Sequence, residues 1–498
     1  MNRSLCLFST VLLLSFSFGQ LWADEDHRFK RQNLKVNGEI IEKMYEDLDG
    51  DSLVDVLIFY LEGEDENTKR MVGLFKQQTD SGFDTIPHQV FELDRKASVV
   101  DMADLDKNGK KELLFLAGDG VYYYSLNGGG FNEKPSLLFS TTNFLPSPEE
   151  DIMIWDFCPD FEDEDELVIV PQMRGYDIWS EESQGEFVRK SKLRFKPDIS
   201  LNSSSGKLDQ DRGSIRLSYK IPGLIFTDYN KDEKEDILIL GEDKMYVFLS
   251  KGDALFQEEA DEVIAWKSNG EEEEQDFQIE DINGDGIIDL VLNVSGGDLE
   301  KGVKSKTSIY LGKGATGFDL DSPHQIISSE KEASGVLLCD LNGDGRKEMI
   351  MPSMGFSIGS VVKMLVTKSF KFNLYIRSLG KDDIYPDKPN QKMKLSFKVS
   401  FGGSDDFSGI EADDFSGDFN GDGLNDFFYV AGDNVLRFFL GSRGDFFTDK
   451  PQYKMGIEIP ASRHKIIDFN NDNKSDIVFS FANKEDLKNK IVILFSRM

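Results

Sequence analysis

The chain has 498 residues and a formal net charge of −34, because 91 acidic residues outnumber 57 lysines and arginines. A negative excess of this size disfavours nucleic acid and anionic membranes as partners, since both carry phosphate. With 39% hydrophobic residues the chain can still bury a substantial core, so its acidity does not indicate disorder.

The segment 1–23 is typical of a secretory signal peptide, with a positively charged start and an apolar run at Leu5–Phe18. That run is too short to span a membrane comfortably. We expect cleavage after Ala23, a single mature domain at 24–498, and a secreted, periplasmic or cell-surface location. An uncleaved membrane anchor is the alternative. No later stretch of the sequence predicts a transmembrane segment.

A nine-residue acidic pattern recurs along the rest of the chain, with oxygen-bearing side chains at positions one, three, five and nine. A clear copy is Asp-Ile-Asn-Gly-Asp-Gly-Ile-Ile-Asp at 281–289. The seven copies begin at Asp47, Asp104, Asp228, Asp281, Asp340, Asp418 and Asp468.

An eighth copy is degenerate. It has Cys158 at position one and keeps acidic residues at Asp160, Glu162 and Glu166. We expect this copy to keep the turn and to lose tight metal binding. Cys158 and Cys339, the two cysteines after the signal peptide, do not make a disulfide framework, so free and mostly buried thiols are expected.

Each loop is followed by a short apolar run, rich in β-branched and aromatic side chains, which predicts a strand. A short strand precedes the loop, as at 98–103, and a third strand follows after a turn. A phenylalanine closes the third strand in five units: Phe131, Phe187, Phe256, Phe318 and Phe447. Because the acidic loop and the closing phenylalanine recur together along the chain, they indicate one repeated structural unit.

The spacing of the loops predicts an all-β fold, a β-propeller in which each loop belongs to one four-stranded antiparallel blade. Two longer intervals hold insertions, a surface loop near 200–214 and a segment near 357–383 with a short helix at 360–367. Only the segment 477–498 follows the last loop, enough for two strands. We therefore expect the N-terminal segment 27–38 to supply the missing strand and close the ring. Eight blades are predicted, and seven is the alternative.

These loops resemble the repeats of the FG-GAP/VCBS propeller proteins, which include the integrin alpha-chain head and uncharacterised secreted bacterial proteins. The resemblance rests on the pattern D-x-[DN]-x-[DN]-G-x-x-[DE] before a hydrophobic strand, and it covers nearly all of residues 35–498. It implies calcium in the loops on one face of the disc, with ligands usually bound at the other face. Ser52, Glu233 and Asn473 replace the glycine of position six, which implies weaker or strained sites there.

Calcium takes six to eight oxygen ligands, which each loop can supply from four side chains and the main-chain carbonyl of position seven. Two carboxylates about 4 Å apart repel by about 4 kcal/mol at an effective dielectric near 20, so a loop without an ion is expected to open. Acidic turns that hold no ion are the alternative. The predicted Ca²⁺ ligands are Asp47, Asp49, Asp51, Leu53, Asp55, Asp104, Asp106, Asn108, Lys110, Glu112, Asp228, Asn230, Asp232, Lys234, Asp236, Asp281, Asn283, Asp285, Ile287, Asp289, Asp340, Asn342, Asp344, Arg346, Glu348, Asp418, Asn420, Asp422, Leu424, Asp426, Asp468, Asn470, Asp472, Lys474 and Asp476.

Evidence for an enzyme is sparse, because the four histidines lie in different units and none is in a zinc-ligand spacing or a nucleophile motif. The expected function is a secreted or periplasmic, calcium-stabilised scaffold that binds a protein or a glycan on the face away from the loops. It is expected to be monomeric or part of a surface complex. The alternative is a polysaccharide-active enzyme, since some polysaccharide lyases resemble this architecture.

Overall fold

A computed structural model describes most of the chain from residue 27 to its end. The predicted signal peptide and its cleavage after Ala23 lie outside the described residues, as does most of the degenerate loop. The described part is 27–498 without 64–67, 80–81, 149, 162–166, 184, 205–213, 254, 267–272, 299–301, 315–316, 330–331, 355–357, 399–413, 432–433, 458–462 and 482–485.

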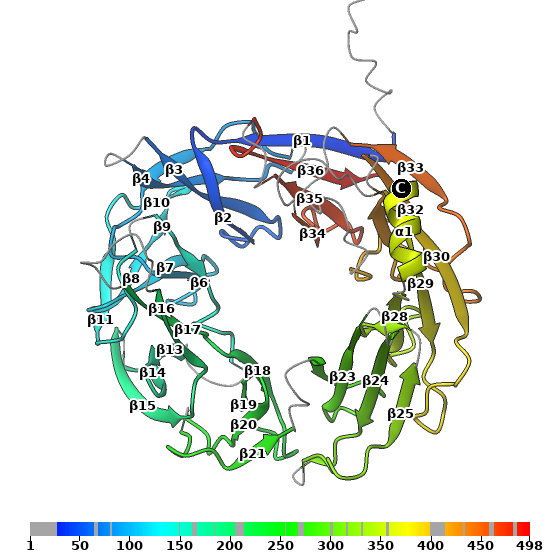
Figure 1. Cartoon of the computed structure of the whole chain (residues 1–498). Helices are drawn as coiled ribbons and strands as arrows, with labels where there is room; N and C mark the ends of the chain where they lie inside the picture. Colours follow the sequence, from blue (N-terminus) through cyan, green and yellow to red (C-terminus); the bar gives the residue numbers. More distant parts are fainter. Residues whose placement is uncertain are drawn as a thin grey trace, which may run out of the picture.

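Antiparallel sheets follow one another around a common axis and form an eight-bladed β-propeller, so the prediction of eight blades is confirmed (Figure 1). In each blade the chain runs from the inner strand outwards. Blades 1 to 4 consist of β2 (Glu39–Glu46), β3 (Asp55–Glu62), β4 (Lys69–Phe75) and β5 (Gln89–Glu92); β6 (Val99–Ala103), β7 (Glu112–Ala117), β8 (Gly120–Tyr124) and β11 (Ser136–Ser140); β12 (Met153–Ile154), β13 (Leu167–Gln172), β14 (Gly175–Ser183) and β15 (Glu186–Arg194); and β18 (Gly223–Thr227), β19 (Asp236–Leu240), β20 (Lys244–Phe248) and β21 (Glu262–Ala265).

The second half of the ring repeats this plan with more variation at the inner edge. Blades 5 to 8 consist of β22 (Glu273–Glu280), β23 (Asp289–Asp298), β24 (Gly302–Tyr310) and β25 (Gln325–Ser329); β26 (Ala333–Ser334), β27 (Leu337–Cys339), β28 (Glu348–Met354), β29 (Ser369–Arg377) and β30 (Gln391–Lys398); β31 (Phe427–Val430), β32 (Val435–Phe439) and β33 (Tyr453–Gly456); and β34 (Arg463–Ile467), β35 (Asp476–Ser480), β36 (Lys490–Ser496) and the N-terminal β1 (Phe29–Lys35).

The remaining elements are two hairpins and the one helix of the described residues. A small hairpin of β9 (Leu126–Asn127) and β10 (Gly130–Phe131) extends blade 2. The helix α1 (Ile358–Thr367) confirms the helix predicted at 360–367. The insertion near 200–214, expected to be a loop, instead has paired strands at both ends, β16 (Ile199–Ser204) and β17 (Ser214–Tyr219).

The ring is closed by the first strand of the chain, which confirms the role predicted for 27–38. Every residue of β1 pairs antiparallel with β36, so the two ends of the chain share blade 8 (Figure 1). Leu34 is fully buried and Phe29 is 4% exposed. β1 thus covers the edge of β36 and becomes the outer strand of blade 8.

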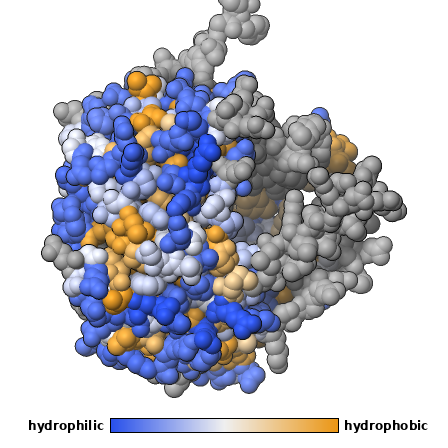
Figure 2. All heavy atoms as spheres, turned by 90° about the vertical axis from the view of Figure 1, so that its left-hand side faces the viewer, coloured by the Kyte–Doolittle hydropathy of each residue, from blue (hydrophilic) through white to orange (hydrophobic). Residues whose placement is uncertain are grey.

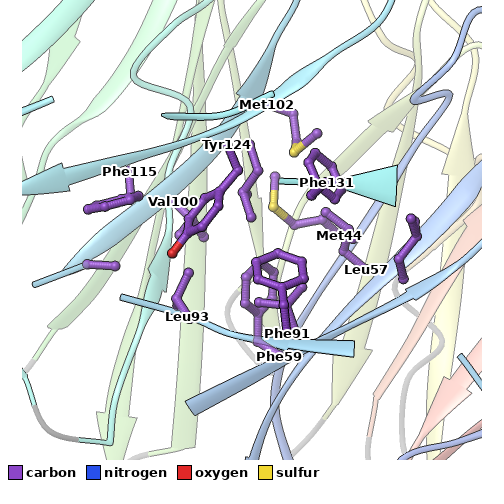
Figure 3. Close-up of a cluster of buried hydrophobic side chains, with 14 of the residues drawn as sticks. Met44, Leu57, Phe59, Phe91, Leu93, Val100, Met102, Phe115, Tyr124 and Phe131 are labelled. Carbon is purple, nitrogen blue, oxygen red and sulfur yellow. The ribbon is translucent and has the colours of Figure 1, made fainter. Parts of the chain in front are cut away.

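Each blade buries both of its faces, which explains why the strands after the loops are apolar throughout rather than alternating. Side chains of successive strand residues point to opposite faces. In β3, Leu57 and Phe59 accordingly pack towards blade 2, while Val56 and Ile58 pack towards blade 8. Figure 3 shows the cluster between blades 1 and 2. The buried residues form eight such clusters, one between each pair of neighbouring blades.

Blade 3, which carries the degenerate loop, is irregular at its inner edge. Its first strand, β12, pairs in parallel with β6 of blade 2, and not with β13 of its own blade. The Ile169 amide donates to the Phe157 carbonyl, at 2.7 Å, and so joins the residues after β12 to β13. Cys158 is buried and Cys339 is half-buried, and neither forms a disulfide, as predicted.

The connections between strands alternate between the two ends of each blade, because successive strands run in opposite directions. The acidic loops all connect a first strand to a second, and we call the end where they lie the loop face. The β16–β17 hairpin connects blade 3 to blade 4, and α1 connects the second and third strands of blade 6. Both insertions therefore emerge at the opposite end, the insertion face.

The side of the ring that lies on the left of Figure 1 is mostly hydrophilic, and apolar residues occur on it in small separate groups (Figure 2). Val90 on β5 and Leu137 on β11 are 45% and 50% exposed. Scattered apolar residues of this kind are ordinary on protein surfaces. None of the helices in the described ranges has the length and apolar character needed to cross a bilayer.

Candidate metal centres

On the loop face, several neighbouring acidic loops are joined by main-chain hydrogen bonds. In these pairs the main-chain amide at position eight of one loop donates to a carbonyl at the start of the preceding loop. Lys111 donates to Leu48, Lys347 to Ile282 and Val54 to Phe469, each at 2.9 Å, and the last bond joins the final loop to the first. The sequence gives no sign of these bonds, because they are made by main-chain atoms.

Each loop folds around its position-one aspartate in the same way. In the loop at 281–289, Asp281 accepts hydrogen bonds from the amides of Gly284 and Gly286, both at 2.7 Å. The position-five side-chain oxygen accepts from the amide of position seven, as Asp285 does from Ile287 at 2.8 Å. The bond from the position-six amide to the position-one carboxylate is present in all seven loops. These main-chain amides therefore hold the side chains of positions one and five in place.

Positions four and six have a positive φ in every one of the seven loops, which is why glycine is common there. At position six, Ser52, Glu233 and Asn473 stand in for glycine with φ of 67°, 66° and 61°. A side chain in this conformation costs about 1–2 kcal/mol, so these three loops are strained, as the sequence implied. Weaker metal binding there stays a prediction.

The position-nine carboxylates lie at, or directly before, the start of the second strands and are nearly inaccessible to solvent. Asp426 is fully buried and accepts hydrogen bonds from the Phe419 amide at 2.8 Å and the Gly441 amide at 2.6 Å. It thus ties the loop to the end of the third strand, a role that sequence reasoning missed. Burial raises the pKa of the position-nine groups, to about 6 for Asp236 and to about 7 for Asp55, Glu112, Asp289, Glu348, Asp426 and Asp476.

The residues present fit a cation. Side-chain oxygens of Asp47, Asp49 and Asp51 lie within 4.8 Å of one another, as do those of Asp104, Asp106 and Glu112. Three predicted ligand oxygens are buried without a hydrogen-bond donor: Asp49 Oδ1, Asp55 Oδ2 and Asn470 Oδ1. Buried acceptors without a donor are rare, because they lose their water without compensation, and a bound cation would satisfy them.

The position-seven residues were predicted only for their carbonyl oxygens, but the side chain of Arg346 has a structural role as well. Its guanidinium donates to the Asn283 carbonyl at 3.1 Å, the Gly380 carbonyl at 2.6 Å and the Asp383 carboxylate at 2.7 Å. It thus joins two neighbouring acidic loops to the turn between β29 and β30.

The loop of blade 1 differs from the others because Lys76 reaches it. The Lys76 ammonium forms an ion pair with Asp49, and both side chains are about one-fifth exposed. Burial lowers the pKa of Lys76, but the hydrogen bond to Asp49 and the nearby carboxylates raise it more, and the net shift is upwards. The equivalent position holds an apolar residue in blades 4, 5, 7 and 8: Leu249, Leu311, Leu440 and Phe495.

Replacement of Lys76 by leucine is expected to strengthen calcium binding at the first loop. The change removes a positive charge in contact with a predicted ligand, so the affinity of that loop should rise at least about tenfold. Isothermal titration with Ca²⁺ would detect the change. Lys69→Leu, which removes a cation paired with Glu92 at the other end of β4, is the control. Equal titration curves for the two variants would show that Lys76 does not compete with the ion.

Comparison with known proteins supports the class of fold. A family model described as an FG-GAP-like repeat matches residues 228–292, 281–351 and 418–479. Each match begins at an acidic loop and extends into the second strand of a blade. The chain therefore carries FG-GAP-like repeats and is consistent with an FG-GAP repeat β-propeller family, as the sequence resemblance implied. A search of curated proteins found no match.

Solved structures similar to the chain are distant. A lectin of Agrocybe aegerita that recognises non-reducing terminal N-acetylglucosamine is 13% identical, with a TM-score of 0.37, and 75% of this chain and 96% of that chain are covered. The biofilm matrix protein Bap1 of V. cholerae is 10% identical, with a TM-score of 0.34 and coverage of 95% and 91%. The WD40 domain of SCAP from fission yeast is 13% identical, with a TM-score of 0.36 and coverage of 94% and 98%. Similarity at this level carries no argument about a ligand.

Proposed function

We propose that this protein is a calcium-stabilised β-propeller that acts as a binding scaffold for a protein or a glycan outside the cytosol. The observation that carries the proposal is the set of seven acidic loops on one face of the propeller, which fold alike around their position-one aspartates. The leader-like segment 1–23 supports export, and sites of this kind suit the millimolar calcium of extracellular fluids.

The ion would act on stability rather than on chemistry. Each loop gathers three or four carboxylates from predicted ligands in one short stretch of chain. When bound, calcium supplies the positive charge that these groups lack. The loop residues hold the side chains in place, because the amides of positions four to seven orient the carboxylates of positions one and five. Where two loops are hydrogen-bonded, as the Asp47 loop is to the Asp468 loop, a stiffer loop should also restrain its neighbour.

The insertion face is the proposed binding surface. Both large insertions emerge there, and loop-borne side chains on a rigid propeller are a common way to build a ligand site. The loop face, in contrast, is occupied by the acidic loops. His88, His324 and His464 lie in blades 1, 5 and 8, so the described structure does not bring these three histidines together.

Calcium is expected to raise the melting temperature of the metal-stripped chain 24–498 by roughly 10 °C or more, and magnesium is not expected to raise it. Each site contributes about 1.4 kcal/mol to stability when calcium is at a tenfold excess over its dissociation constant, and the contributions of several sites add. Thermal unfolding followed by circular dichroism, with each ion at the same millimolar concentration, measures the effect. Equal stabilisation by the two ions, or no stabilisation of a chain shown to lack bound metal, would contradict the proposal.

A further inference from the structure

A groove of about 810 Å³ crosses the insertion face between blades 3 and 4. Its walls are the turn between β13 and β14 at 173–174, the segment 195–198 that follows β15, the end of β17 at 218–220, and Glu242 in the next blade. The β16–β17 insertion thus forms one side of it. This volume lies within the usual range for small-ligand sites, about 300–1,000 Å³.

The groove has positive charge available in a strongly acidic protein. Arg174 and Lys196 line it, both are exposed, and neither has an ion-pair partner among the residues that the structure describes. The groove is also lined by a third cation, Lys220, and by two acidic groups that are bonded to other lining residues, so the lining has one more positive than negative side chain. Glu242 pairs with Lys220, and Asp198 accepts a hydrogen bond from the Glu242 amide at 3.3 Å.

The groove also has an exposed apolar side chain beside these cations, because Met173 is 42% exposed next to Arg174. Phe195 and Pro197 also line the groove, on either side of Lys196, but are largely buried. A guanidinium matches a carboxylate or sulfate through paired hydrogen bonds, and apolar side chains suit the C–H face of a sugar ring. Charge and apolar surface therefore occur together within one groove.

An acidic peptide fits this groove less well, because the nearest strand edge is already bonded. The Arg194 amide, at the end of β15, donates to the Glu258 carbonyl at 2.7 Å, and the Phe256 amide donates to Ser191 Oγ at 2.8 Å. An extended peptide gains affinity by adding its main chain to an open edge, and that edge is not open here.

We propose that this groove binds an anionic glycan, with Arg174 and Lys196 contacting its carboxylate or sulfate groups. The proposal rests on the proposed scaffold function, for which it names the ligand class and the site. An anionic ligand would explain why Arg174 and Lys196 have no ion-pair partner among the described residues although the chain has a net charge of −34.

The test measures binding of defined probes to the full chain in calcium buffer by isothermal titration. Polygalacturonate oligomers carry carboxylate, dextran sulfate oligomers carry sulfate, neutral dextran carries neither, and polyglutamate represents an acidic peptide. We expect one of the two anionic glycans to bind, and which of them binds identifies the charged group. The double variant Arg174→Gln with Lys196→Gln should weaken this binding at least about tenfold.

A matched control removes the same charge elsewhere. Lys192→Gln with Lys454→Gln changes two exposed lysines outside the groove and should alter binding less than about twofold. Both double variants should melt at the wild-type temperature. The proposal is overturned if neither anionic glycan binds, if the two double variants bind alike, or if polyglutamate binds and the groove variant loses it. The melting temperature of the same preparation is measured with and without calcium. If calcium still raises it, only the groove proposal fails; if calcium does not raise it, the proposed function fails as well.

Discussion

A chain that begins at residue 37 is expected to lose the cooperative unfolding of the chain 24–498. The deletion removes β1 and so exposes the whole edge of β36 (Figure 1). It also removes the buried side chains of Phe29, Leu34 and Val36. Each such side chain contributes about 1.5–3 kcal/mol, and the lost ladder adds to this total, so the loss approaches the full stability of an ordinary domain. Thermal unfolding and size-exclusion chromatography would show a broad transition and self-association through the open edge.

Point substitutions separate the loss of packing from the loss of chain length. Leu34→Ala should cost about 2–5 kcal/mol, because its side chain is fully buried. Arg31→Ala, an exposed residue in the same strand, should cost little. A synthetic peptide of residues 24–37, added to the truncated chain, should restore part of the lost stability. A truncated chain that melts at nearly the same temperature as the longer one would show that the ring does not depend on β1.

The architecture could be predicted from the sequence because its signals are local and repeated. A strand such as β3 is apolar at nearly every position, since both of its faces pack against other blades. Together with an acidic loop before each such strand, this pattern defines the blade and allows the blades to be counted. The short C-terminal remainder after the loop at 468–476 indicated closure by the N-terminus, and the pairing of β1 with β36 confirms it.

What the sequence could not show depends on contacts between blades or on main-chain atoms. Lys76 follows the third strand at a position that reads as ordinary, yet its ammonium reaches back to Asp49 in the loop before the second strand. The strands at 199–204 and 214–219 pair although the stretch between them is rich in serine and polar residues. Position nine carries an acidic residue in every copy, so the sequence predicts a metal ligand there. The structure shows that groups such as Asp426 are buried and accept hydrogen bonds from main-chain amides, a role that the sequence does not reveal.

That distinction leads to a direct comparison between Asp426 and Asp422, two predicted ligands of the same loop. Asp426→Ala is expected to lower the free energy of unfolding with or without calcium. The substitution leaves the buried amides of Phe419 and Gly441 without an acceptor. Each unsatisfied group costs about 1–3 kcal/mol, so the total loss is about 2–6 kcal/mol. Denaturant unfolding in EDTA and in millimolar calcium measures both conditions.

Asp422→Ala, in contrast, should lower the free energy of unfolding mainly in calcium and only slightly in EDTA. Its side chain is exposed, and its bond to the Leu424 amide, at 3.0 Å, is partly open to solvent, so the metal-free chain should lose at most about 1 kcal/mol. In calcium the same variant should lose the contribution of one site, because a predicted ligand is absent. If Asp422→Ala were as damaging as Asp426→Ala in EDTA, position five would carry a structural role of its own. If Asp426→Ala were harmful only in calcium, the buried group would act as a ligand, and its two amide bonds would contribute little.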